Sequence, residues 1–435
     1  MNKILKIFLI CIFIISAVFI FQKNFIDEYK NDKIVSTDKN LASTLKFKGL
    51  QGAVDFVLDE EGNYYIAFKN SIQIIKVNGK SYELFKSSNI NIDSLCYSDK
   101  KLYYSSETKI FCFDLTAGKN SEIMNDLPNL GDYKESILRV KGDYLYITIG
   151  AASNSGVIGE DNIWLSNLPY FHDISPNSIT LKGINFGQEN TGAFQSPKTK
   201  SIKGQMISGH FPGNASVIIY NTKSRESETF AWGIRNIKGM DFTSEGKLIA
   251  TVGGMENRGL RPIIGDSDYI YEIKKGTWYG WPDYSGGDPV NSPKFKGKNN
   301  SEVKLILENH PTTNPPAPIY QSKAVSELGA VAVDPEGVIG EKNVIYFYDS
   351  GNNKIYSLDK KSILKEKFIL PSNFSGCIMK FYKNKFFILD NSSGNLFSIE
   401  NSSNSQNLSF NEKISLYLLI TIIFGIIIVL KVQRE

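Results

Sequence analysis

The side chains that most often carry out chemistry are few in this sequence and lie far apart. The chain has three histidines, and their spacing is not that of metal ligands. All three fall in long irregular stretches, where we expect solvent-exposed loop residues: His172, His210 and His310. The G-x-S-x-G, H-E-x-x-H and P-loop motifs do not occur. Local motifs therefore give no starting point for a functional assignment.

The four cysteines do not indicate a metal site or a disulfide framework. Cys11 lies in an apolar segment, and Cys377 is far from the others in the sequence. Cys96 and Cys112 fall in the first and third runs of one predicted three-strand unit, so we expect them not to be neighbours. Because a free cysteine behaves as a small apolar side chain, we predict buried free thiols.

The clearest structural signal lies in residues 232–287. Three runs alternate apolar and polar residues, at 238–242, 247–251 and 269–273, and a turn that contains Gly246 separates the first two. Alternation around a glycine-bearing turn predicts a β-hairpin, which the third run extends to a meander. Pro282 ends the pattern, because proline has no N–H for a strand ladder.

This stretch resembles the quinoprotein glucose/sorbosone dehydrogenase family. The family pattern is an Arg-Asn pair, a strand, a Gly-ended turn, a second strand, a Gly-rich loop, a third strand, and then Tyr-Gly-Trp-Pro. The matching pieces occur here in that order, at 235–236, 239–242, 245–246, 248–251, 253–254, 269–273 and 279–282. The resemblance implies a six-bladed β-propeller whose relatives bind pyrroloquinoline quinone (PQQ) and calcium and oxidise sugars.

The resemblance assigns candidate ligand-binding residues. Arg235 and Asn236 retain the family's Arg-Asn pair, which implies a contact to an anionic or polar ligand at the mouth of the central channel. Trp281, in the Tyr-Gly-Trp-Pro motif, is expected to bind ligand with them. An alternative interpretation gives Arg235 a structural role, in which it braces backbone carbonyls between blades.

The family's calcium loop follows the second strand of this blade and uses backbone carbonyls. Gly254 and Met255 lie at that place, and Asp266 and Asp268 follow an inserted segment, 256–265. Carbonyl oxygens together with a carboxylate suit calcium. The resemblance therefore implies a calcium site at these four residues, and the alternative is a surface loop.

The family's catalytic base and cofactor-binding cations are not matched. Tyr133 stands where the family has its histidine base, and Ala151 stands where the family has the aspartate that orients it. The runs 350–354 and 372–376 match the family positions that supply cations to the cofactor, and they hold none in register. Because a base and its orienting group act together, and an unperturbed tyrosine has a pKa near ~10, we expect weak base catalysis at best.

A weak repeat extends the propeller prediction to most of the chain. Strand–turn–strand–strand units occur at 53–77, 94–115, 137–149 with 217–220, 238–273, 330–358 and 377–399. Six such units predict an all-β, six-bladed propeller over 42–400, and a strand from 45–50 is expected to complete the last blade. Two irregular regions, 151–213 and 283–318, are expected to lie over one face without forming a blade.

Apolar segments near both ends predict a membrane protein. Residues 1–21 have a basic start and an apolar remainder, as in a signal peptide or an uncleaved signal anchor. Residues 414–430 form a second apolar segment, a predicted transmembrane helix, and positive charges follow it. Positive charges outside both segments place both ends in the cytoplasm. We therefore expect linkers at 22–41 and 401–413 and a propeller on the extracytoplasmic side of the cell membrane.

Three functions are compatible with these observations. The favoured hypothesis is a propeller that kept the family scaffold, lost the redox site, and binds a sugar, a small anion or a protein partner. The alternative is an active PQQ- and calcium-dependent sugar (aldose) dehydrogenase. A lactonase-like hydrolase is a third possibility, but no set of inward carboxylates stands out for it. A net charge of only +4, spread along the chain, gives no indication of nucleic-acid binding.

Overall fold

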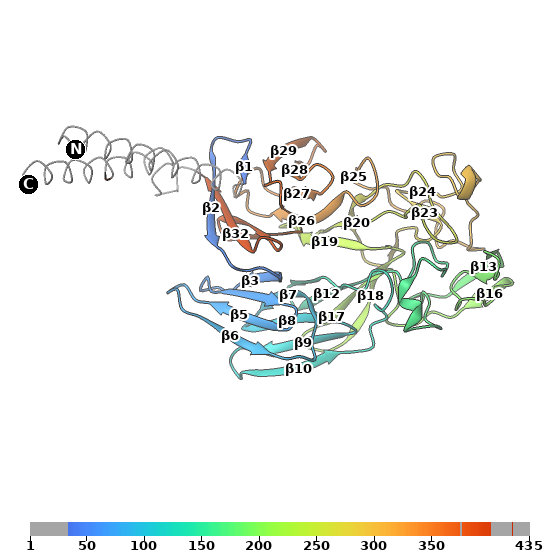
Figure 1. Cartoon of the computed structure of the whole chain (residues 1–435), viewed down its shortest axis with the longest axis horizontal. Helices are drawn as coiled ribbons and strands as arrows, with labels where there is room; N and C mark the ends of the chain where they lie inside the picture. Colours follow the sequence, from blue (N-terminus) through green and yellow to red (C-terminus); the bar gives the residue numbers. More distant parts are fainter. Residues whose placement is uncertain (1–33, 375, 402–419, 421–435) are drawn as a thin grey trace, which may run out of the picture.

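The computed structural model describes residues 34–374, 376–401 and 420. Six sheets of four or five strands form a ring, and the two long inserts project from one end of it (Figure 1). The predicted all-β, six-bladed propeller is therefore confirmed. We number the blades 1 to 6 from the first complete sheet in the chain.

Blades 1 and 2 are built from consecutive antiparallel strands, whereas the first insert separates two strands of blade 3. Blade 1 contains β3 (Ala53–Leu58), β4 (Tyr64–Phe68), β5 (Ser71–Ile75) and β6 (Ser81–Lys86). Blade 2 contains β7 (Ile92–Ser98), β8 (Lys101–Ser106), β9 (Lys109–Asp114) and β10 (Lys119–Met124). Blade 3 contains β11 (Leu138–Lys141), β12 (Tyr144–Ile149), β17 (Ser216–Asn221) and β18 (Ser227–Trp232), to which β22 (Thr277–Trp278) adds in parallel.

Blades 4 to 6 complete the ring. Blade 4 contains β19 (Ile237–Phe242), β20 (Leu248–Val252), β21 (Tyr269–Ile273) and β25 (Tyr320–Gln321). Blade 5 contains β26 (Leu328–Asp334), β27 (Val344–Asp349), β28 (Lys354–Leu358) and β29 (Leu364–Ile369). Blade 6 contains β30 (Cys377–Tyr382), β31 (Lys385–Asp390) and β32 (Asn395–Asn401). The inner three strands of each blade are those that the repeat predicts.

The core of the propeller lies between neighbouring blades. The alternating strands bury one set of side chains against the blade before and the other set against the blade after. Phe56 and Ile66 of blade 1 pack with Phe387 and Leu389 of blade 6, for example, and all four side chains are buried. Truncating such a buried phenylalanine to alanine costs about 3–5 kcal/mol, so each of these contacts fixes one blade to the next.

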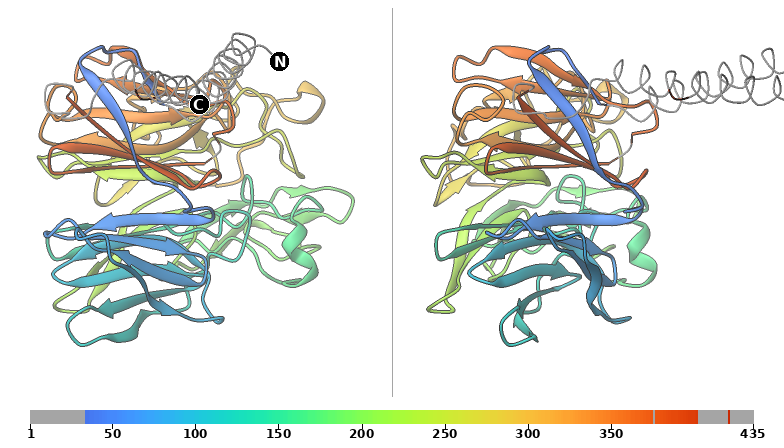
Figure 2. Two further views of the ribbon diagram at one scale, coloured as in Figure 1. Left: turned by 60° about the vertical axis from the view of Figure 1, so that its left-hand side comes forward. Right: turned by 90° about the vertical axis from the view of Figure 1, so that its left-hand side faces the viewer.

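The N-terminal part of the described chain closes the ring. β2 (Leu41–Phe47) pairs with β32 as the outer strand of blade 6, and β1 (Val35–Ser36) pairs with β29 at the edge of blade 5. Figure 2 shows these N-terminal strands, in blue, against the C-terminal strands, in orange and red. The expected closing strand exists but begins earlier than 45, because the pairing extends over the whole of β2. The predicted linker at 22–41 is therefore wrong at its C-terminal end, where the chain already belongs to the propeller.

The two inserts, 151–213 and 283–318, fold together into one lobe beside blades 3 and 4 (Figure 1). The lobe contains only short elements, among them β13 (Ile179–Lys182) and β16 (Lys203–Ile207), and neither insert forms a blade, as predicted. Its core joins both inserts to the loops of blade 4, with Leu181, Phe194, Trp281 and Leu307 buried together. The inserts are therefore packed structure rather than two independent loops.

Among the residues that the structure describes, the prediction of buried free thiols is confirmed for Cys96 and Cys112, whereas Cys377 is half-buried. Cys96, Cys112 and Cys377 are free thiols, and the first two are buried. Cys96 and Cys112 both lie opposite Tyr103, on the two strands that flank β8, so a strand separates them. Cys11 lies outside the described residues.

The membrane predictions fall largely on residues that the structure does not describe. Residues 1–21 lie outside the described range, and residue 420 is the one described position in the segment 414–430. Over the described part of the chain, no helix has the length and apolar character needed to cross a membrane.

Candidate functional site

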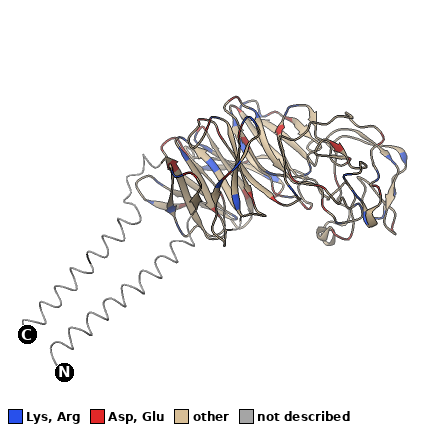
Figure 3. Cartoon of the chain, turned by 90° about the horizontal axis from the view of Figure 1, so that it is seen from above, with Lys and Arg blue, Asp and Glu red and all other residues tan. Residues whose placement is uncertain are grey.

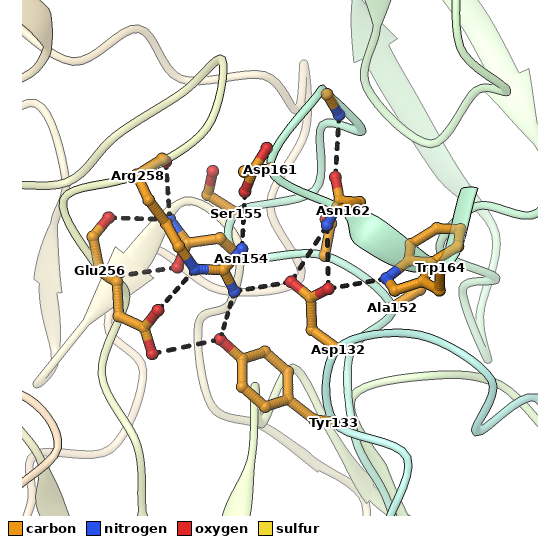
Figure 4. Close-up of polar contacts among 12 residues, drawn as sticks. Asp132, Tyr133, Ala152, Asn154, Ser155, Asp161, Asn162, Trp164, Glu256 and Arg258 are labelled. Atoms are coloured by element: carbon orange, nitrogen blue, oxygen red, sulfur yellow. Dashed lines mark hydrogen bonds and ion pairs between the residues drawn. The ribbon is translucent and has the colours of Figure 1, made fainter. Parts of the chain in front are cut away.

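Loops of blades 3 and 4 bring two of the predicted residues into direct contact. Tyr133 precedes β11, and Arg235 precedes β19. The Tyr133 hydroxyl oxygen accepts a hydrogen bond from Nη2 of Arg235. It also accepts one from Nη2 of Arg258 at 2.9 Å, which Figure 4 shows. The guanidinium carbon of Arg235 also lies 4.3 Å from the centre of the Tyr133 ring, a cation–π contact. The side chain at the family's base position is therefore held between two guanidinium groups.

Arg258 is the centre of this network (Figure 4). Its guanidinium nitrogens lie 2.6 Å from Asp132 Oδ2, 2.6 Å from Asp161 Oδ2 and 2.5 Å from Glu256 Oε2. Burial alone would lower the pKa of Arg258, but hydrogen bonds to Glu256 and Asp132 outweigh it and raise this pKa above its ordinary value. Charge-assisted bonds of this kind are short and strong, so Arg258 is fixed in place by protein carboxylates.

Arg235 is buried and makes mainly structural contacts. Its Nε donates to the carbonyl oxygen of Asn154 at 3.0 Å, and its Nη1 lies 3.4 Å from the carbonyl oxygen of Gly253. Its Nη2 lies 3.1 Å from Glu256 Oε1. Burial lowers the pKa of Arg235 to about 10, although the nearby Glu256 carboxylate acts in the opposite direction. Arg235 therefore links the loops that carry Asn154, Gly253 and Glu256. A contact between Arg235 and a ligand stays a prediction.

The remaining predicted residues of this region surround the same network. Ala151 is buried, and its N–H donates to the carbonyl oxygen of Arg235 at 2.8 Å. Trp281 is also buried, and its indole N–H donates to the carbonyl oxygen of Asn154 at 3.2 Å. Asn236 is half-buried beside them. A ligand-binding role for Asn236 and Trp281 therefore stays a prediction, whereas their position next to Arg235 is observed.

The four residues of the implied calcium site are also brought together. The N–H of Gly254 donates to Asp268 Oδ1 at 3.1 Å, and the N–H of Met255 donates to Asp266 Oδ2 at 2.6 Å. Lys238 Nζ lies 2.8 Å from the other oxygen of Asp268. The hydroxyl groups of residues 269 and 285 donate to the other oxygen of Asp266.

This donor set does not fit calcium. The loop directs N–H groups, not carbonyls, at the two carboxylates, and an ammonium group already neutralises Asp268. Across the described ranges, no group of three or more His, Cys, Asp or Glu side chains is placed to hold a metal ion. The carboxylates instead fix the loop that leads to residues 256–258.

The cations near the channel mouth do not fit a tricarboxylate such as PQQ. Arg235, Arg258 and Lys238 each pair with protein carboxylates. Lys354, in the run that matches a family cation, pairs with Glu366 at 2.8 Å. Binding PQQ at these cations would leave buried Asp and Glu side chains unpaired beside its carboxylates, a loss of several kcal/mol.

Sequence reasoning missed the residues that complete the network. Asp132, Asn154, Asp161, Glu256 and Arg258 come from three separate segments of the chain. The one signal that could have indicated them is the concentration of charge in the inserted segment 256–265, next to the family's calcium loop.

His310 is a second site that the sequence did not reveal. Its Nε2 lies 2.9 Å from Oδ2 of the buried Asp283, and its ring stacks on Trp278 with 5.7 Å between centroids. Asp283 also pairs with the buried Arg261 at 2.8 Å. The expectation of a solvent-exposed loop residue is wrong for His310, whose side chain is 10% exposed, and correct for His210. Arg261, which lies in neither insert, also donates to the carbonyl oxygen of Ser155 at 3.0 Å, so this cluster links the second insert to the first.

Comparisons with known proteins agree with the fold. The family model described as glucose/sorbosone dehydrogenase matches residues 195–332, which include Arg235 and Trp281 but not Tyr133. No curated protein sequence matches the chain.

Solved structures extend the likeness over most of the chain. The holo form of the PQQ domain of a pyranose dehydrogenase from Coprinopsis cinerea is 11% identical, with a TM-score of 0.55, over 85% of this chain and 97% of that one. A calcium structure of a family AA12 enzyme from Trichoderma reesei is 12% identical, with a TM-score of 0.56, over 85% and 97%. The PQQ-bound aldose sugar dehydrogenase from Streptomyces coelicolor is 12% identical, with a TM-score of 0.50, over 84% and 99%.

The resemblance read from the sequence is thereby confirmed: the chain carries a glucose/sorbosone dehydrogenase match over residues 195–332 and folds as a six-bladed β-propeller similar to those of PQQ-dependent sugar dehydrogenases.

Proposed function

We propose that this protein is a membrane-anchored, extracytoplasmic propeller of the glucose/sorbosone dehydrogenase type that binds a ligand or protein partner and does not oxidise sugars. One observation carries the proposal. The position of the family's base is occupied by Tyr133, which lies under Arg258 and against Arg235. The Tyr133 hydroxyl donates to Glu256 Oε1 at 3.4 Å, but that carboxylate is itself paired with Arg235 and Arg258. A carboxylate held between two guanidinium groups is a weak base, so Tyr133 lacks the activated base that general-base catalysis requires.

The charge balance of the network supports the same proposal. Two guanidinium groups face three carboxylates, those of Asp132, Asp161 and Glu256, and they are joined by direct ion pairs. An anionic cofactor would have to displace these internal pairs, which are already short and well formed.

The ends of the described chain support anchoring at one side of the molecule. Leu41, near the start of the described chain, lies opposite Asn401, near its end, in the β2–β32 pair. The predicted apolar segments 1–21 and 414–430 lie beyond these two residues in the sequence, and positive charges outside both segments favour an extracytoplasmic propeller. Protease treatment of intact cells should release propeller fragments, and protection of the propeller until the cells are lysed would contradict this topology.

The test of the redox proposal is a cofactor titration of the full chain in detergent. Purified protein receives PQQ and calcium, and the quinone absorbance and aldose-dependent dye reduction are followed, with the PQQ-bound aldose sugar dehydrogenase from Streptomyces coelicolor as the positive control. We expect no saturable absorbance change and a rate at least about 10²-fold below the control, the low end of the loss expected without a general base.

A matched variant tests whether the Arg258 side chain blocks a cofactor site or whether the protein has no cofactor site at all. Arg258→Ala removes the side chain that covers Tyr133, and Lys354→Ala removes a paired cation on the surface of blade 5 as a control. Dye reduction by the unaltered protein would favour the alternative, a PQQ- and calcium-dependent sugar dehydrogenase that uses another base. Saturable PQQ binding without turnover would show that the family cofactor is retained as a ligand.

A further inference from the structure

The strand β16 forms one edge of a small sheet at the far end of the lobe (Figure 1). It pairs with β13, and β13 pairs in turn with Leu307 of the second insert through an isolated bridge. Over the described chain, no strand lies on the other side of β16. The sheet therefore ends at β16 with one side open.

The backbone pairing shows which groups of β16 face outward. The carbonyl oxygen of Thr180 accepts the N–H of Glu308, so Thr180 faces the second insert. Because hydrogen-bonding direction alternates along a strand, Ile179 faces β16, where its partner is Ile207. The preceding residue of β16, Met206, must then direct its N–H and C=O away from β13, toward solvent.

The side chains around this open edge are unusually apolar for a surface. Ile202 and Met206 are each 69% exposed, and Phe211 is 42% exposed. Lys200 and Lys203 are also exposed here, and neither forms an ion pair within the described residues. Basic residues likewise mark the far end of the lobe in Figure 3. Exposed apolar side chains next to unpaired charges are typical of interaction surfaces.

We propose that the open edge of β16 receives an extended segment of a partner protein as an added strand, and that this segment alternates apolar and acidic side chains. Main-chain bonds to Met206 supply part of the affinity, and Ile202 and Phe211 contact alternate side chains of the added strand. The acidic residues pair with Lys200 and Lys203.

The same lysines argue against a second copy of this chain as the occupant. Two β16 edges placed side by side would bring Lys203 of each copy close together, and lysine on an edge strand is a common means of preventing such pairing. The register shift of the β13–β16 pair also shortens the regular edge. An acidic partner turns this repulsion into attraction.

Strand addition at β16 rests on the proposed binding function and gives it a partner, but it uses a different surface from the network around Arg258. The β16 edge belongs to the lobe, whereas the cofactor titration tests the network around Arg258. Absence of peptide binding would therefore not change the conclusion from the cofactor titration. Likewise, PQQ-dependent sugar oxidation would not change the conclusion from peptide binding.

The test measures binding of a fluorescein-labelled peptide of alternating valine and glutamate to the full chain in detergent, by fluorescence anisotropy. Met206→Pro deletes the outward N–H without removing a bond to β13, and we expect Kd to rise about 10-fold, the equivalent of one net hydrogen bond. Met206→Ala keeps that N–H and should raise Kd about threefold or less. Lys203→Glu should raise Kd about fivefold and weaken its dependence on salt.

Several outcomes would overturn the proposal. These are equal binding of a valine–lysine peptide or a scrambled peptide, unchanged affinity in both Met206→Pro and Lys203→Glu, or a dimer in light scattering that Met206→Pro dissociates. Slower hydrogen exchange at the Met206 amide in the presence of peptide would support strand addition directly. If Met206→Pro lowers the melting temperature of the protein, Lys203→Glu and the exchange measurement decide the question.

Discussion

Replacing Arg258 by alanine tests the network at the channel mouth most directly. The change removes the cation that Asp132, Asp161 and Glu256 share. Breaking a fully buried ion pair costs about 3–5 kcal/mol. Arg258 is 27% exposed, so water screens part of this loss and we expect about 2–3 kcal/mol. With an unfolding entropy of about 2.1 cal/mol/K per residue, a propeller of this size should melt about 3 °C lower.

The pH dependence of this loss gives a second, more specific readout. In the unaltered protein the pKa of Glu256 is lowered: burial would raise it, but the attraction of Arg235 and Arg258 prevails. This contribution to stability is present above the unfolded pKa of about 4.3 and is lost as the pH falls through the lower folded value. Without Arg258 the Glu256 carboxylate loses much of this attraction and its pKa rises, so protonation below about pH 5 relieves the repulsion from the neighbouring carboxylates.

The assay is thermal unfolding of the full chain in detergent at pH 7.5 and at pH 4.5. We expect the difference in melting temperature between the unaltered protein and Arg258→Ala to narrow at the lower pH. Arg258→Lys keeps the charge but loses the planar fork, and it should show about half of the loss. Adding Glu256→Gln to Arg258→Ala should restore about 1 kcal/mol. A shift below about 1 °C at pH 7.5, or one that does not depend on pH, would refute the reasoning.

Two further variants test other parts of the site. Asp173 lies beside the site, where its buried carboxylate accepts hydrogen bonds from the N–H groups of Ala152 and Ser153. Burial raises the pKa of Asp173 to about 7, so the free energy of unfolding should fall as the pH rises from about 4 to 7, by at most about 4 kcal/mol. Melting curves of Asp173→Asn should lack that decline, and an equal decline would contradict a raised pKa at Asp173. A Cβ on Gly254 would lie 1.9 Å from the carbonyl oxygen of Ser267, so Gly254→Ala should cost about 1–3 kcal/mol in unfolding free energy, whereas Gly246→Ala, where the nearest atom is 3.9 Å away, reports the cost of a left-handed backbone alone. Equal losses in the two glycine variants would argue against close packing at Gly254.

The sequence predicts the inner strands of the blades better than the outer ones. Inner strands such as β4 and β20 alternate side chains between two buried blade interfaces, which leaves a readable apolar pattern. The outer strand β10 is mostly exposed and polar, so it carries little periodic signal. It forms because its backbone pairs with β9, and a polar strand of this kind cannot be told from a loop by pattern alone.

The sequence predicts the region of the site but not the residues that complete its network. The family motif predicts that Tyr133 and Arg235 belong to one site, and their side chains are in contact, whereas a role at the channel mouth stays a prediction. The partners that change their chemistry come from distant parts of the chain, such as Asp161 and Arg258, and no local pattern links these positions. The core of the lobe likewise depends on contacts between distant residues, because Leu181 and Leu307 bridge two inserts that are far apart in sequence. Such contacts depend on the closed ring, which sets the two inserts side by side.

The closure by β1 and β2 has a consequence for how the chain folds. The strands made first, β1 and β2, pair with β29 and β32, which are made last, so the ring cannot close until synthesis of the propeller is complete. Until then the edges of blades 5 and 6 and the inner faces of blades 1 and 6 remain open, and contacts of such long sequence separation form slowly. Once closed, the two pairings tie the ends of the chain together across two blades, so opening the ring requires both to break. The propeller should therefore be vulnerable during its synthesis and slow to open once it is finished.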